Sequence, residues 1–307
     1  MKWSDLTTLI VALILGGVFC PGFAQAGQGA VVVTVSPFAQ IASRLAGPGA
    51  QTHVIIKPGQ SPHSYEATPG VLKRIASADL VVMAGLGLDN WTLKMALAAG
   101  KSPEDVVDCS EAIDAERLLG FDLGDHDHGS MHGDHDHGGA NPHYWLDPTM
   151  MVLAARRIAA RLAEKYPPEE KAAVARRLED LERDLMALDE EIGRKLSGVK
   201  GGFVALHGAW GYFARRYGLD QVGVIEASPG KAASARKMAD LANRMKKQGA
   251  TAVITEPQLN PRLAQVLAAE SGARVVMADP IGGVPGRDGY FEMMRFNAEA
   301  FAKALAK

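Results

Sequence analysis

Residues 167–198 decide the fold, and they read PPEEKAAVARRLEDLERDLMALDEEIGRKLSG. The segment opens with two prolines and two acidic residues and closes on Gly198, which are the boundary signals of a helix. Its apolar residues fall at spacings of 4, 3, 4, 3, 4 and 4, which place them on one helical stripe: Val174, Leu178, Leu181, Leu185, Leu188, Ile192 and Leu196. About 29 residues at ~1.5 Å rise per residue predict one helix of about 43 Å.

The segments on both sides of this helix alternate between strand and helix patterns, which indicates βαβ units and parallel sheets. Before it we predict strands at 31–35, 52–56, 79–84 and 105–108, and helices at 38–46, 69–77 and 89–99. After it we predict strands at 202–206, 221–225, 251–255 and 273–277, and helices at 209–217, 231–248, 260–270 and 288–305. The sequence therefore predicts an α/β protein of two lobes, each with a four-stranded parallel sheet flanked by helices.

The apolar stripe of the long helix has two interpretations. It could be a solitary coiled-coil strand, or a helix that packs along both lobes. A single stripe of about three heptads between two α/β segments favours the second interpretation. We therefore expect an N-terminal lobe at 27–166, a linker helix at 167–198 and a C-terminal lobe at 199–307. Because a helix is stiffer than a Gly/Ser linker, we expect only small motions between the lobes.

The N-terminus has the pattern of a cleavable export signal. A charged start, MKW, precedes an apolar run at residues 6–20 and the tripeptide AQA. The run is shorter than the ~20 residues of a transmembrane helix, and no later apolar stretch of about 18 residues exists. We expect a signal peptide at 1–26, cleaved after Ala26, and a soluble periplasmic protein. A lipid anchor at Cys20 is less favoured, because such a cysteine usually follows a small residue and Phe19 is large.

Composition excludes several classes of protein. The 307 residues include 33 lysines and arginines against 35 aspartates and glutamates, and the formal net charge is −2. That balance gives no general basic field, so we expect no nucleic-acid partner. Two cysteines cannot form a multi-disulfide framework or a cysteine-based zinc finger.

The nine histidines are unusual because five of them fall within the stretch FDLGDHDHGSMHGDHDHGGAN at 121–141. This stretch also has five aspartates and five glycines, so we expect a flexible surface loop at 122–139. Donors without fixed geometry must be ordered on coordination, which predicts weak metal binding and a role in metal capture for delivery to His143. The alternative is a solvated tract without a role. The five residues are His126, His128, His132, His135 and His137.

Four histidines remain outside that loop. His53 lies inside a predicted strand and is interpreted as a structural or surface residue. His63 and His207 follow predicted strands, as Asp279 does, and His143 lies between the loop and a helix. Ligands of parallel sheets bind outside the carboxyl ends of the strands, so these four residues form a plausible site with two members from each lobe.

Three imidazoles and one carboxylate suit a borderline-soft cation in tetrahedral geometry, and Zn²⁺ is the natural candidate. Each ligand must be deprotonated to bind. We therefore expect metal binding to weaken as the pH falls through the ordinary histidine range near ~6.5.

Five motifs then occur in the order found in the metal-binding proteins of ABC importers for zinc and manganese, the cluster A-I family. They are GQSPHSYE at 59–66, NPHYWLDP at 141–148, HGAWGYF at 207–213, TEPQ at 255–258 and DPIGG at 279–283. The chain resembles this family over essentially its whole mature length. The resemblance implies two α/β lobes with the metal clamped in the cleft between them, a membrane permease as the partner, and the ligands His63, His143, His207 and Asp279.

Position 207 bears on the choice of metal. Manganese-preferring relatives generally place a glutamate there, and a harder oxygen donor suits manganese better, so His207 favours Zn²⁺ as the transported ion. A manganese or iron receptor is the closest alternative. Whether Asp279 or a water takes the fourth position stays open. Some zinc-binding relatives carry a disulfide in the C-terminal lobe, which we do not expect here because no cysteine follows Cys109.

Glu256 follows a predicted strand at the same sheet edge, and two roles compete for it. It orients a ligand histidine by accepting the other ring N–H, or it caps the helix at 260–270. A zinc hydrolase would need it as a general base, and the chain has no HExxH motif. We therefore expect a monomeric receptor and not an enzyme. A zinc buffer or metallochaperone without a transporter remains a further alternative.

Overall fold

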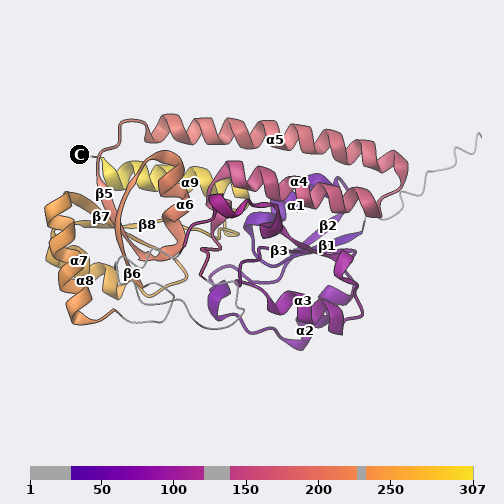
Figure 1. The fold of residues 1–307 in the computed structure, drawn as a ribbon, viewed down its shortest axis with the longest axis horizontal. Coiled ribbons are helices and arrows are strands. Elements are labelled where there is room, and N and C mark those ends of the chain that lie inside the picture. The colour runs from indigo at the N-terminus through magenta and orange to yellow at the C-terminus, as the bar shows by residue number, and fades with distance from the viewer. Residues whose placement is uncertain (1–28, 121–138, 227–232, 307) are drawn as a thin grey trace, which may run out of the picture.

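Two four-stranded parallel sheets form the two lobes of the computed structural model, which describes residues 29–120, 139–226 and 233–306 (Figure 1). The strand orders are β2-β1-β3-β4 and β6-β5-β7-β8, so the lobes share one topology. The strands are Ala30–Val33 (β1), Gln51–Val54 (β2), Leu80–Met83 (β3), Val106–Asp108 (β4), Gly202–His207 (β5), Asp220–Glu226 (β6), Ala250–Thr255 (β7) and Arg274–Met277 (β8). In each sheet the second strand lies on one side of the first strand, and the third strand lies on its other side. Such a reversal of strand order creates a crevice at the carboxyl ends of the strands.

Nine α-helices in the described residues cover these sheets. They are Pro37–Ala46 (α1), Pro69–Ala76 (α2), Trp91–Ala98 (α3), Pro148–Lys165 (α4), Pro168–Leu196 (α5), Gly211–Tyr217 (α6), Ala235–Gln248 (α7), Arg262–Ser271 (α8) and Tyr290–Leu305 (α9). Each predicted strand and helix is present, with ends that move by a few residues. The prediction of two four-stranded α/β lobes is therefore confirmed. The export signal with Cys20 and the histidine-rich loop, apart from Gly139, lie outside the described residues.

Helix α5 runs the length of the molecule above both lobes (Figure 1). It buries its predicted stripe, except that Leu178 is only partly buried. It packs against α4 and α1 of the N-terminal lobe and against α6 and α9 of the C-terminal lobe. Surface ion pairs contribute little to stability, so the buried stripe is what holds this helix in place. The packing along both lobes confirms the second interpretation of the segment.

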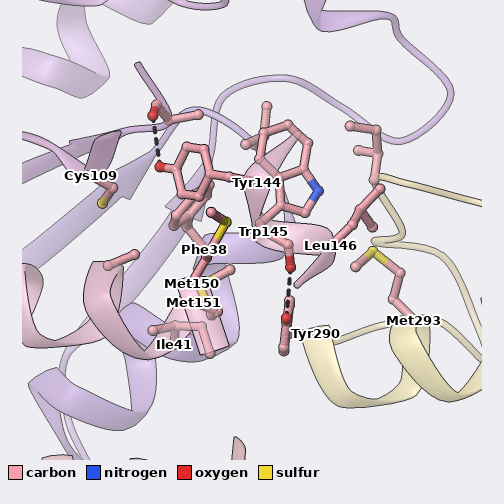
Figure 2. Packing of buried hydrophobic residues seen from close by; sticks show 14 of the residues in the cluster. Phe38, Ile41, Cys109, Tyr144, Trp145, Leu146, Met150, Met151, Tyr290 and Met293 are labelled. Atoms are coloured by element: carbon pink, nitrogen blue, oxygen red, sulfur yellow. Dashed lines mark hydrogen bonds between the residues drawn. The ribbon is translucent and has the colours of Figure 1, made fainter. Parts of the chain in front are cut away.

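The two lobes share one hydrophobic core. A single cluster of buried side chains includes strands β1 and β3 of the N-terminal lobe, helices α4, α5 and α9, and residues of β5 and β7. Figure 2 shows part of this cluster, where Tyr144 and Trp145 pack against Phe38 of α1 and Tyr290 of α9 donates to the carbonyl of Trp145. A second, smaller cluster lies in the C-terminal lobe beneath α7 and α8. A core that continues from one lobe to the other supports our expectation of small lobe motions.

None of the helices built from the described residues is both long and apolar enough to cross a membrane. Helix α5 has the length, but charged residues cover the faces that its stripe leaves exposed.

Candidate metal centre

His207 is the last residue of the fully buried central strand β5, and the next strand in the sheet, β7, is followed by Glu256. Both carboxylate oxygens of Glu256 lie 3.1 Å from His207 Nδ1. A carboxylate only accepts hydrogen bonds, so Nδ1 carries the proton and Nε2 keeps its lone pair. Nε2 is buried and has no hydrogen-bond partner in the described structure. The arrangement presents a fixed nitrogen donor, and it places Glu256 in the predicted orienting position.

His143 is oriented by Asn141, two residues earlier in the chain. The amide oxygen of Asn141 accepts from the backbone N–H of His143 at 3.0 Å and lies 2.7 Å from its Nδ1. Since an amide oxygen cannot donate, the His143 proton is on Nδ1 and Nε2 is free to bind a cation. The side chain of Asn141 also donates to the carbonyl of Gly208 at 2.6 Å, which ties this turn to the C-terminal lobe.

Asn141 was not assigned a role by the sequence, although it begins the motif NPHYWLDP. The available signal was an asparagine just before a histidine, because asparagine side chains often bond to the backbone two residues later. That signal occurs in many turns. It says nothing about a ring nitrogen, so it could not identify the residue as the one that fixes His143.

His63 lies in the short 3₁₀ helix Pro62–Ser64 that follows β2. Its Nε2 is 3.2 Å from Nε2 of His143. The ring centroid of His207 lies 4.9 Å from that of His63 and 4.8 Å from that of His143. The structure thus brings three of the four predicted ligands together, from three separate segments of the chain.

The donor atoms of these three histidines all lie within 4.8 Å of one another. A tetrahedral Zn²⁺ with bonds of about 2.0–2.1 Å to nitrogen separates its ligands by about 3.3 Å. The distance between His63 Nε2 and His143 Nε2 already has this value, and the widest separation in the group needs to contract by at most about 1.5 Å. The group therefore fits a small cation after a modest adjustment.

Electrostatics keep two of these imidazoles neutral. Burial, with a smaller contribution from nearby His207, lowers the pKa of His63 from 6.5 to about 3. Burial also lowers the pKa of His143, and His207 and His63 add to the effect. Both side chains are thus uncharged at neutral pH, and a neutral imidazole keeps one ring nitrogen with a lone pair that can bind a metal. For His63, the structure moves the expected onset of proton competition from near 6.5 to about 3.

Asp279 is buried beside this group and is engaged elsewhere. Its Oδ1 accepts hydrogen bonds from Gln258 Nε2 at 2.9 Å and from the backbone N–H groups of Ile281 and Gly282 at 3.1 and 3.0 Å. Its Oδ2 forms an ion pair with Arg287 Nε at 3.1 Å. Asp279 is not a member of the metal-binding group found among the described residues. Direct ligation by Asp279 stays a prediction.

A small cavity of about 10 Å³ lies at the three histidines, between the two lobes. Its lining combines the three imidazoles with polar and apolar side chains of both lobes: Ser61, Pro62, His63, His143, His207, Glu256, Gln258, Leu259, Pro280 and Ile281. His53 is far from this role, because it is exposed on edge strand β2. The site is thus a small cavity to which both lobes contribute nitrogen donors.

Residues 31–304 match the family model of ZnuA, described as the periplasmic component A of the zinc-uptake complex. The chain is 28% identical to the high-affinity zinc uptake system protein ZnuA of Haemophilus influenzae, over 90% of this chain and 93% of that protein. A crystal structure of ZnuA superimposes with a TM-score of 0.77 at 27% identity, covering 91% of this chain and 99% of that one. A zinc-bound ZnuA deletion mutant gives a TM-score of 0.74 at 26% identity, covering 91% and 98%.

Proposed function

We propose, because this chain belongs to the ZnuA family of periplasmic zinc-uptake components, that it binds Zn²⁺ between its lobes and delivers it to an ABC-type membrane importer. The observation that carries the proposal is the group of His63, His143 and His207, whose donor atoms lie within 4.8 Å of one another. Two of these imidazoles are held by Glu256 and Asn141 with their Nε2 atoms available. Such support raises the basicity of a ligand and fixes its direction.

The donor set favours zinc over manganese or iron. Three neutral imidazoles suit Zn²⁺, whereas Mn²⁺ prefers carboxylate, carbonyl and water oxygens. The carboxylate of Asp279 is taken up by Arg287 and three hydrogen-bond donors. We therefore assign the three histidines as the protein ligands. Direct binding by Asp279 would require it to leave the ion pair with Arg287.

The environment of Glu256 also suits a metal receptor better than a zinc hydrolase. A general base needs a free carboxylate near a bound water. Both oxygens of Glu256 face His207 Nδ1 in a buried position, so the side chain is committed to orienting a ligand. We infer that the protein transports its metal and does not use it for catalysis. A zinc buffer would use the same site, and only an interaction with a permease separates these two functions.

Export and metal capture complete the proposal. Removal of residues 1–26 would release a periplasmic monomer whose histidine-rich loop at 122–139 collects Zn²⁺ and passes it to His143. If zinc uptake from a scarce supply is unchanged when 122–139 is deleted, the capture role is wrong. Growth on limiting zinc of cells that carry the deletion measures this uptake.

Competition titration of the mature protein with Zn²⁺ and Mn²⁺ tests the metal assignment. The native protein should prefer Zn²⁺, and His207→Ala should lose most of its affinity. His53→Ala is the matched control, since it removes an exposed histidine of the same lobe as His63. A native preference for Mn²⁺, or unchanged zinc binding by His207→Ala, would refute the proposal. His207→Glu should shift the preference toward Mn²⁺.

Delivery needs its own experiment. Membrane vesicles that contain the cognate importer should accumulate Zn²⁺ when the native protein is added outside, and His207→Ala should not support uptake. Zinc binding without any stimulated uptake would favour the buffer function instead.

A further inference from the structure

Gln258 shares the cavity with the three histidines and has a buried oxygen without a partner. Two buried side-chain atoms of the cavity lining lack a hydrogen-bond partner in the described structure, His207 Nε2 and Gln258 Oε1. The first is a nitrogen ready to bind a metal. The second is an acceptor that needs a donor, because a buried polar group without a partner is unfavourable.

The orientation of the Gln258 amide follows from its contact with Asp279. Gln258 Nε2 lies 2.9 Å from Asp279 Oδ1 and donates to it. The same oxygen accepts from two backbone N–H groups, and the other oxygen is paired with Arg287. An ionised carboxylate cannot donate, so the amide nitrogen must face Asp279. Gln258 Oε1 is thereby left as the end of the amide that is free to accept.

We propose that Gln258 Oε1 accepts a hydrogen bond from the water that completes the coordination of the ion held by the three histidines. Asp279 then acts on the site through Gln258, as a positioning residue and not as a ligand. The inference rests on the proposed function, because it assumes an ion bound by His63, His143 and His207. Gln258 and the three histidines line the same small cavity.

This arrangement makes Gln258 a determinant of metal choice. A water held at one place by an amide completes a four-coordinate ion without adding a charged oxygen ligand. Zn²⁺ accepts three histidines and a water, whereas Mn²⁺ favours more oxygen donors. By binding Gln258 and Arg287, Asp279 keeps its own carboxylate out of the coordination sphere. The ion pair of Asp279 with Arg287 therefore serves selectivity as well as packing.

Gln258→Met tests the inference, because methionine has a similar length and lacks the amide. We expect its Zn²⁺ affinity to fall about 10-fold to 100-fold, the usual effect of losing a partner in the outer coordination shell. Co²⁺ serves as a coloured probe of coordination, and its visible spectrum should change in the variant. Gln221→Met is the matched control, since Gln221 Oε1 is also buried without a partner but lines a different cavity. That control should keep the native affinity and spectrum.

A double-mutant cycle separates the role of Asp279 from direct ligation. If Asp279 acts through Gln258, then Asp279→Asn should weaken zinc binding in the native background and have little further effect in Gln258→Met. Fully additive losses would mean that Asp279 touches the ion itself, and would overturn the inference. Thermal unfolding of each metal-free variant checks its fold. If Asp279→Asn does not fold, the spectrum of Co²⁺-loaded Gln258→Met decides alone.

The outcomes distinguish this inference from the proposed function. Native zinc binding by His207→Ala would refute the function itself. Loss of binding by His207→Ala together with native affinity and spectrum for Gln258→Met would refute only the role of Gln258.

Discussion

Residues 57–68 and residues 141–147 each bring one histidine to the metal group, but the first turn is largely exposed and the second is buried throughout. In the buried turn, Tyr144 donates to the carbonyl of Ala84 at 2.7 Å, and Tyr290 donates to the carbonyl of Trp145 at 2.7 Å (Figure 2). In the exposed turn, backbone bonds such as Gln60 to Lys57 close within the turn itself.

The difference shows how a site between two lobes can bind an ion without a large closure. Asn141 and Glu256 fix His143 and His207, so these two ligands form a rigid pair. His63 lies on the exposed turn, and its Nε2 is 3.2 Å from the Nε2 of His143. We expect the adjustment of at most about 1.5 Å that Zn²⁺ requires to fall on the 57–68 turn.

The largest expected effect concerns stability. Trp145 is completely buried and donates to the carbonyl of Pro280 at 2.8 Å, whereas Tyr65 of the exposed turn is only partly buried and packs beside Trp91 at the edge of the core. Trp145→Ala should lower the free energy of unfolding by about 3–5 kcal/mol, and Tyr65→Ala by about 1 kcal/mol. Urea unfolding of the metal-free proteins measures both. Equal losses would mean that the two turns are held equally firmly.

Removal of a fixed ligand should follow in size. His143→Ala should weaken Zn²⁺ binding by more than about 100-fold, because loss of an outer partner alone costs about 10–100-fold. His63→Ala should cost less, since the turn that carries His63 is largely exposed and water can take the place of its ring. Chelator competition gives both affinities. A larger loss in His63→Ala than in His143→Ala would reverse our assignment of the fixed and adjustable ligands.

Release of a fixed ligand from its support should have a smaller effect. Asn141→Ala leaves His143 in place but removes the acceptor at its Nδ1, so zinc affinity should fall about 10–100-fold. Asn141→Asp keeps an acceptor and should restore most of the binding. If Asn141→Asp binds no better than Asn141→Ala, the amide is needed for its bond to Gly208 and not for His143.

The smallest effect is a dependence of stability on pH. The folded protein lowers the pKa of His63 to about 3, so the unfolded chain takes up its proton first as the pH falls. Neutral His63 therefore contributes fully to the free energy of unfolding above about pH 6.5, and this contribution declines as the pH falls toward 3. Between pH 7 and pH 5 the expected loss is at most about 2 kcal/mol.

Urea unfolding of metal-free protein at pH 7 and 5 measures this change. His63→Gln should reduce the pH dependence, while His143 maintains part of it. His53→Gln, exposed on β2, should behave like the native protein. An unchanged pH dependence in His63→Gln would show that His63 is already protonated in the folded state at pH 5.

Much of the fold could be predicted from the sequence because its signals are local. The apolar stripe from Val174 to Leu196 has a spacing of three or four residues, and the apolar runs of the central strands are continuous. Both patterns can be recognised from residues that are close together in the sequence. Parallel topology then places the ends of the strands at one edge. His207 could be recognised as a site residue for that reason, without any knowledge of its contacts.

Apart from Glu256, the partners of the site residues could not be found in this way. Asp279 has the position of a ligand in the sequence, but in the structure its carboxylate forms an ion pair with Arg287 and accepts a hydrogen bond from Gln258. Gln258 lies 21 residues from Asp279 along the chain, and no periodic pattern connects them.

The sequence by itself determined the two α/β lobes, the long helix and three histidines that meet between the lobes. The tertiary structure alone decided which nitrogen of each fixed histidine faces the cavity, and that Asp279 faces Arg287. The reason is physical. Burial and periodicity follow from nearby residues, whereas the direction of a polar side chain depends on donors and acceptors that folding brings from distant segments.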